Sequence, residues 1–140
     1  MDEIKKNQKR RFFRLDVILP VKYRKFTGNP IFQGRFNVGR TNDLSIGGIK
    51  MVVSRPIPVG TKLEMEIELG SGINPYVVGK VLGGDEKILN GVSRRIEKVR
   101  FEEVDTEAQD VMIKFIFDHQ RKEVRKKNQL EVSNAKKRKR

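Results

Sequence analysis

The stretch TKLEMEIEL, residues 61–69, decides how this chain folds. Its apolar residues at 63, 65, 67 and 69 alternate with charged residues at 62, 64, 66 and 68. Successive side chains of a β-strand point to opposite faces, so this alternation predicts a strand with one face buried and one face in water. The same period of two runs from Val17 to Phe26, and further strands are expected over residues 34–45, 49–53 and 76–82.

Turn residues separate these strands, and the period changes near the end of the chain. We expect Gly83-Gly84-Asp85 to turn the chain before one bent strand or two short strands over Lys87–Val104. A helix is expected from about Glu107 to about Lys127, opened by a capping box over Thr106–Gln109. Its apolar residues recur at helical spacing: Ala108, Val111, Met112, Phe115 and Ile116. These elements predict a mainly β protein, a small six-stranded antiparallel β-barrel with a C-terminal α-helix.

The net charge of +13 is concentrated at the two ends of the 140-residue chain. Residues 1–14 carry +4, residues 15–120 carry +1, and residues 121–140 carry +8. We therefore expect a flexible N-terminal arm over residues 1–8, one domain over residues 9–127, and a disordered basic tail over residues 128–140. A barrel that binds RNA or DNA more often has its basic stripe on the fold itself, which makes nucleic acid an unlikely partner.

The chain has no cysteine and no apolar run that approaches ~18 residues. It offers neither a disulfide nor a thiolate metal ligand, and no membrane-spanning segment is expected. No apolar signal core follows the charged N-terminus, so we expect a soluble cytoplasmic protein. An enzyme is not expected, because the sequence shows no nucleophile–base pair, no metal-ligand cluster and no phosphate-binding glycine loop.

Two short motifs contain groups suited to a phosphorylated guanine. The first, KRRFFR, spans residues 9–14 and precedes the first strand; its cationic residues are Lys9, Arg10, Arg11 and Arg14. The planar donor fork of arginine matches two phosphate oxygens at a time, and it also matches O6 and N7 of guanine. The plainer explanation is that these residues form a solvated charge run.

The second motif, DLSIGG, spans residues 43–48 at the end of an expected strand. Asp43 and Ser45 lie two residues apart and so project from the same side. The carboxylate can accept hydrogen bonds from guanine N1–H and the exocyclic amine, and the hydroxyl can serve a further ligand atom. Gly48, together with Gly47, leaves room for backbone and ligand to approach closely. The plainer explanation is that Asp43 and Ser45 cap a turn through local hydrogen bonds.

Together the two motifs, in this order and about thirty residues apart, resemble those of the PilZ domain family. The likeness runs from about Lys9 to Arg125 and includes LPVKY at residues 19–23 and VRF at residues 99–101 before the capped helix. One departure is Lys98, where the family often has glycine. The helix run FDHQRK, residues 117–122, is similar to the flagellar-brake branch of the family.

The resemblance implies a six-stranded barrel that binds the bacterial second messenger cyclic di-GMP, with no metal and no other cofactor. It implies that Arg10 and Arg14 grip the ligand and that Lys9 stands beside them. The full set of expected ligand-binding residues is Lys9, Arg10, Arg11, Arg14, Asp43, Ser45, Gly47 and Gly48.

The hypothesis from sequence is a non-catalytic cyclic di-GMP sensor or effector. Ligand capture would change its conformation or its binding to an unknown protein partner, such as the flagellar motor, and so regulate motility, adhesion or secretion. Two alternatives stay open at this point. One is a small basic β-barrel that binds RNA or DNA, and the other is a protein–protein module whose nucleotide site is unused.

Overall fold

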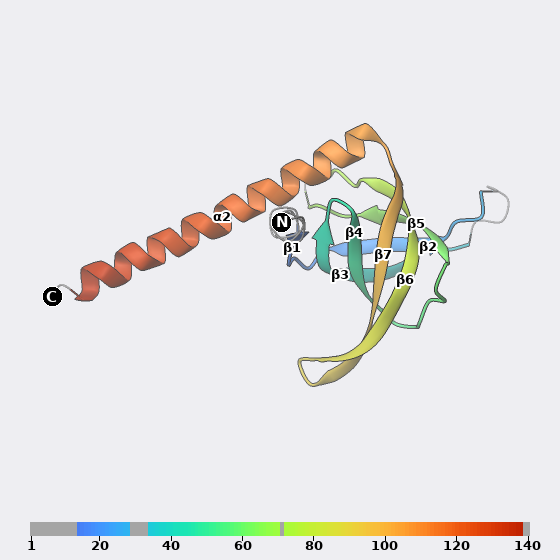
Figure 1. The fold of residues 1–140 in the computed structure, drawn as a ribbon, viewed down its shortest axis with the longest axis horizontal. Helices are drawn as coiled ribbons and strands as arrows, with labels where there is room; N and C mark the ends of the chain where they lie inside the picture. The colour runs from blue at the N-terminus through green and yellow to red at the C-terminus, as the bar shows by residue number, and fades with distance from the viewer. Residues whose placement is uncertain (1–13, 29–33, 71, 139–140) are drawn as a thin grey trace, which may run out of the picture.

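Six strands close into a barrel, and a short seventh strand adds to it (Figure 1). The computed structural model describes residues 14–28, 34–70 and 72–138, and it describes the side chains of the terminal helix as far as Lys122. Within these residues the strands are β1 Arg14–Leu15, β2 Pro20–Lys25, β3 Asn37–Ser45, β4 Gly48–Val53, β5 Lys62–Ile67, β6 Tyr76–Leu89 and β7 Val92–Val104.

All strand pairs are antiparallel, and their order is β1-β3-β2-β5-β6-β7-β4. A further pairing between β3 and β4 closes the ring of six strands from β2 to β7, while β1 pairs with β3 beside β2. This arrangement confirms the predicted six-stranded antiparallel barrel. Closure pairs each of the six ring strands with a neighbour on both sides within the ring, while the β6–β7 hairpin extends beyond it to Leu89 and Val92.

The apolar faces predicted from the alternation fill the barrel. The residues of β5 that were expected inside, Leu63, Met65 and Ile67, are buried, and so are Val21 and Tyr23 of β2. Removal of this apolar surface from water is the main contribution that stabilises the fold. The opposite face of β5 departs from the expectation at one position, because Glu64 is also buried.

The prediction of a turn at Gly83-Gly84-Asp85 is wrong. β6 continues through these residues to Leu89, and the chain turns instead at Asn90-Gly91, where both residues have positive φ angles of 52° and 78°. Such angles suit a tight two-residue hairpin turn. Gly83 has a φ of 144° at the point where the β6–β7 register shifts, so this glycine makes a bulge rather than a turn.

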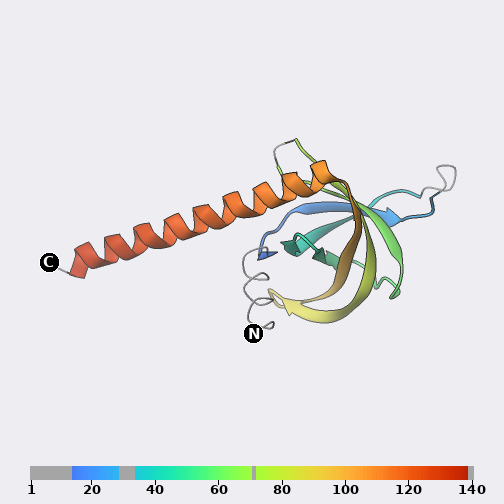
Figure 2. The ribbon, with the colours of Figure 1, turned by 45° about the horizontal axis from the view of Figure 1, so that its top comes forward.

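The helix α2, Thr106–Arg138, follows β7 and projects beyond the barrel as a single long element (Figure 2). Its predicted apolar face is confirmed, because Ala108, Met112 and Ile116 are buried against the barrel core. The expected capping box is not the cap that forms. Asp105 caps the helix instead, and its Oδ1 accepts a hydrogen bond from the Ala108 N–H at 2.6 Å.

The helix also ends later than the sequence predicted. It continues to Arg138 rather than stopping near Lys127. No glycine or proline stands between Thr106 and Arg138 to stop the helix. Among the described residues, no helix is both long and apolar enough to cross a membrane.

Candidate functional site

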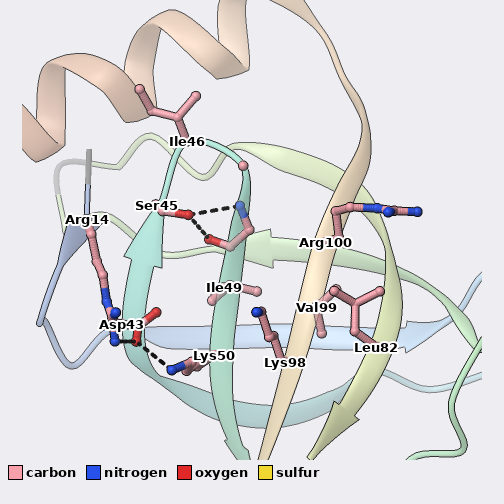
Figure 3. Close-up of a pocket in the computed structure, with 12 residues that line it drawn as sticks. Arg14, Asp43, Ser45, Ile46, Ile49, Lys50, Leu82, Lys98, Val99 and Arg100 are labelled. Carbon is pink, nitrogen blue, oxygen red and sulfur yellow. Dashed lines mark hydrogen bonds and ion pairs between the residues drawn. The ribbon is translucent and has the colours of Figure 1, made fainter. Parts of the chain in front are cut away.

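A hollow of about 560 Å³ lies where β1, β3, β4, β6 and β7 approach one another (Figure 3). It brings together every predicted site residue that the structure describes: Arg14, Asp43, Ser45, Gly47 and Gly48. The hollow is also lined by residues that the sequence analysis did not select: Ile46, Ile49, Lys50, Leu82, Lys98, Val99 and Arg100. Lys9, Arg10 and Arg11 lie outside the described residues.

The two motifs meet through an ion pair at the wall of this hollow. Arg14 Nη2 donates to Asp43 Oδ2 at 2.7 Å, although 29 positions separate the two residues in sequence. The pairing of β1 with β3, in which Arg14 lies opposite Ser45, brings them together. The side chain of Asp43 is 7% exposed and that of Arg14 is 47% exposed. The carboxylate is therefore held in the wall, while the guanidinium has access to solvent and to a ligand.

Thr41 fixes the chain segment that leads from Arg14 to β2. Its buried hydroxyl accepts a hydrogen bond from the Leu19 N–H at 2.8 Å and donates to the Val17 carbonyl. On the other side, Gln120 Nε2 of α2 donates to the Arg14 carbonyl at 3.0 Å. The sequence analysis missed Thr41, because a single threonine within a strand carries no signal of this role.

Ser45 shapes the turn between β3 and β4. Its Oγ accepts from the Gly48 N–H at 3.1 Å and donates to the Gly48 carbonyl at 3.0 Å. The plainer interpretation of this serine, a cap of a local turn, is therefore what the structure shows. The hydroxyl holds the corner of the hollow in place beside the Asp43 carboxylate.

The two glycines of the second motif differ in the space that a side chain would have. A Cβ on Gly48 would lie 2.5 Å from the Val99 carbonyl oxygen, because β4 and β7 approach closely at this point. A Cβ on Gly47 would meet nothing within 4 Å. Close approach of two backbones therefore demands glycine at position 48 and leaves position 47 open to a side chain.

Two further strands contribute lysines to the hollow. Lys50 Nζ of β4 lies 3.8 Å from Asp43 Oδ2, and Lys98 of β7 pairs in register with Lys50. Arg100 also lines the hollow, but its side chain points away from Asp43 (Figure 3). The departure at Lys98 does not interrupt β7, which is continuous from Val92 to Val104. Strand alternation from Gly48 to Lys50 was the signal that could have identified Lys50.

The described part of the chain shows no metal-ligand cluster, and its one histidine lies away from the hollow. No three His, Asp or Glu side chains of the described residues gather as ligands for a metal ion. His119 lies on α2, where its Nδ1 is 3.1 Å from the Phe115 carbonyl oxygen and its ring contacts the Phe115 ring. It is therefore held within its own helix rather than placed in the hollow.

The model of the PilZ domain family matches residues 8–118, which is most of this chain. The chain belongs to the PilZ domain family. PilZ domains are generally non-catalytic receptors of cyclic di-GMP. A search of curated proteins found no match.

Solved structures of similar fold include the PilZ domain of YcgR from Escherichia coli with cyclic di-GMP. It is 18% identical, covers 83% of this chain and 95% of its own, and has a TM-score of 0.63. The K. pneumonia MrkH–cyclic di-GMP complex is 15% identical and covers 81% of this chain and 53% of its own, with a TM-score of 0.67.

The Bacillus subtilis inhibitor of motility MotI/DgrA is 16% identical and covers 77% of this chain and 49% of its own, with a TM-score of 0.61. This chain thus spans about half the length of MotI/DgrA and of MrkH. At these identities the likeness is one of fold.

Proposed function

We propose that this chain is a non-catalytic cyclic di-GMP sensor that binds its ligand in the hollow beside Asp43. The observation that carries the proposal is the 2.7 Å contact between Arg14 and Asp43 at the wall of that hollow. Two motifs that are separate in sequence, and that both suit guanine, are adjacent in space. Membership of the PilZ family supports the choice of ligand.

The chemistry of the hollow suits a guanine base joined to phosphate. Asp43 Oδ2 is the oxygen that both Arg14 and Lys50 approach, so Oδ1 remains to accept from guanine N1–H or the exocyclic amine. The half-exposed Arg14 fork can turn to the O6 and N7 edge of the base or to a phosphate. Gly47 borders open space and carries no side chain, so the ring can approach the backbone at this corner.

The remaining cations of the first motif would complete the site from the N-terminal side. Arg10 and Arg11 precede Arg14 by four and three positions, and Lys9 precedes them directly. A few residues of extended chain span about 3.3 Å each, so these side chains are within reach of a ligand beside Arg14. We propose that they close over the bound nucleotide.

Ligand capture would then change the surface that the protein presents to another protein. We propose a cytoplasmic effector whose partner, such as the flagellar motor, is bound or released when cyclic di-GMP is present. Motility, adhesion or secretion would be the regulated process. The contact between Gln120 of α2 and the Arg14 carbonyl provides a physical connection between the site and the long helix.

The test is titration calorimetry with cyclic di-GMP on the wild type, Arg14→Ala and Asp43→Ala. Each substitution should cost about 1–3 kcal/mol of binding free energy, the usual value of a bidentate contact to guanine. Arg35→Ala is the matched control, because Arg35 is an exposed arginine two residues before the opposite end of β3. Its affinity should equal that of the wild type.

Equal affinity in all four proteins would remove the proposed site. The salt dependence separates this proposal from nucleic-acid binding. A protein that binds RNA or DNA through many phosphates loses affinity steeply with salt and has little preference for one dinucleotide. We expect a modest salt dependence and a clear preference for cyclic di-GMP over single-stranded RNA and DNA.

A further inference from the structure

Two lysines face each other across neighbouring strands in the hollow. Lys50 of β4 and Lys98 of β7 are partners in the antiparallel register, so their side chains leave the same face of the sheet. The Cβ atoms of such partners are about 5 Å apart, and like charges placed directly opposite destabilise a sheet. The lysine pair therefore lowers the stability of the protein without ligand. We expect a bound anion to offset this repulsion.

The described protein does not supply that anion to Lys98. No carboxylate of a described residue lies within 4.0 Å of its amine. On the β6 side the residue opposite Lys98 is Gly83, which has no side chain, and the acidic residue nearest in register is Asp85, opposite Ile96. Lys98 thus has a cation on one side and open space on the other.

The acidic partner of Lys50 among the described residues is Asp43, which it shares with Arg14. Its Nζ is 3.8 Å from Asp43 Oδ2, which Arg14 also contacts at 2.7 Å, so two cations share one carboxylate. A guanine that donates hydrogen bonds to Oδ1 would draw negative charge of this carboxylate away from Oδ2 and so weaken the attraction of Oδ2 for both cations. Lys50 would then need another negative group within its reach.

The space next to these lysines can hold such a group. A second hollow of about 420 Å³ adjoins the first, and Lys50, Leu82 and Lys98 line both. The second hollow is further lined by Gly83, Gly84, Asp85, Lys87 and Ile96. The two lysines therefore stand at the junction of two open spaces, from which a ligand group can approach both side chains.

We propose that Lys50 and Lys98 form a phosphate subsite, which binds a phosphodiester of the ligand while Asp43 binds its guanine. This proposal rests on the proposed function. Binding exchanges counter-ions: the Asp43 carboxylate turns to the base, and the amine of Lys50 turns to the phosphate that it shares with Lys98. The like-charge pair, which is unfavourable in the empty protein, becomes favourable in the complex.

The test compares Lys98→Gln with Lys80→Gln by calorimetry with cyclic di-GMP and by thermal unfolding without ligand. Lys80 is the matched control because it is also exposed, makes no ion pair with an acidic residue of the described chain, and lies in register with the cations Lys62 and Arg100. Lys80 lines neither hollow. Both substitutions relieve a like-charge contact, so both should raise the melting temperature of the empty protein slightly.

Only Lys98→Gln should weaken ligand binding, by roughly tenfold, the order expected for loss of one charge-assisted hydrogen bond at a partly exposed site. The loss should shrink at about 1 M salt, because screening then removes the electrostatic contribution from the wild type as well. Lys50→Gln should behave as Lys98→Gln does, and the double variant should lose less than both losses combined, because the two amines share one phosphate.

The outcomes separate the subsite from the proposed function. Wild-type binding that Arg14→Ala weakens but Lys98→Gln leaves unchanged would overturn the subsite alone. A loss in Lys98→Gln that persists undiminished at about 1 M salt would also overturn it, because that loss would be structural. Failure of the wild type to bind cyclic di-GMP would overturn the proposed function and the subsite with it.

Discussion

Three carboxylates of the described residues are buried in this barrel, those of Asp43, Glu64 and Glu97, and each receives a hydrogen bond from an arginine. The surroundings of Glu64 and Asp43 differ. Glu64 of β5 contacts Arg24, its neighbour in register on β2, and accepts from the Tyr76 hydroxyl at 2.9 Å. Arg24 also donates to the Gly34 carbonyl, and its side chain is only 18% exposed. Asp43, by contrast, contacts a half-exposed arginine from a two-residue strand and lies beside an open hollow.

The difference shows that a pair of a carboxylate and an arginine can either join strands or remain available to a ligand. The partners of Glu64 come from the barrel wall, and each contacts this carboxylate, so this cluster joins β2, β5 and β6. The partners of Asp43 can turn to solvent, so its ion pair can be exchanged for a ligand at little cost. Removal of one member of a buried pair is costly, because the other charge is left without compensation.

The largest expected effect is on stability at Glu64. Glu64→Ala should lower the free energy of unfolding by about 3 kcal/mol, because it leaves the largely covered Arg24 guanidinium without its carboxylate. Asp43→Ala should cost at most about 1 kcal/mol, because Arg14 is accessible to water. Urea unfolding followed by circular dichroism measures both values.

The effects on ligand affinity should have the reverse order, with the larger loss in Asp43→Ala. Glu64→Ala protein that remains folded should bind cyclic di-GMP with the affinity of the wild type. Asp43→Ala protein should bind it more weakly than the wild type. If the two variants lost the same stability and the same affinity, the distinction between a structural and an exchangeable carboxylate would be wrong.

A smaller effect is expected at the glycines of the β3–β4 corner. Gly48→Ala should destabilise the protein by about 2 kcal/mol, because its Cβ would lie 2.5 Å from a backbone oxygen of β7 that cannot move freely. Gly47→Ala should stay within about 0.5 kcal/mol of the wild type, since it has open space. The same urea experiment tests this pair, and equal values would show that β4 and β7 are not in close contact here.

The smallest effect concerns pH at the Glu64 cluster. Burial and, secondly, the hydrogen bond to Glu64 together raise the pKa of Tyr76 to about 12. The folded protein therefore holds the phenol proton more tightly than the unfolded chain, whose tyrosine pKa is near 10. This contribution to stability is complete below pH about 10 and is lost as the pH rises towards 12.

Tyr76→Phe should therefore be less stable than the wild type near neutral pH, and the difference should narrow between pH 10 and 12. Unfolding midpoints of the two proteins in urea across this range measure it. A difference that stays constant with pH would mean that the phenol proton is not held by the folded protein.

The alternation of β5 and β2 was sufficient to predict the barrel wall and its core, because burial of one face imposes a period of two. The helix face from Ala108 to Ile116 was predictable for the same reason, with the helical period. Asp43 and Ser45 were predictable as neighbours on one strand. In each case the information lies within a few residues of sequence.

What the sequence could not predict depends on contacts between distant segments. Lys98 lies opposite Lys50 only because β4 and β7 pair in this register, and Arg14 reaches Asp43 only because β1 pairs with β3. Gly83 was assigned to a turn because glycine favours turns and bulges alike. Burial of Glu64 followed from Arg24 on a neighbouring strand, which the alternation within β5 could not reveal.

The most direct test of the central claim is a titration of ¹⁵N-labelled protein with cyclic di-GMP, followed by amide chemical shifts. If Arg14 and the Asp43–Gly48 corner meet around one nucleotide, their amides should shift together, with the same apparent affinity. The amide chemical shifts of Glu64 and Tyr76 should not change. Shifts confined to the Glu64 cluster, or shifts of Arg14 and the Asp43–Gly48 corner with different affinities, would contradict this account.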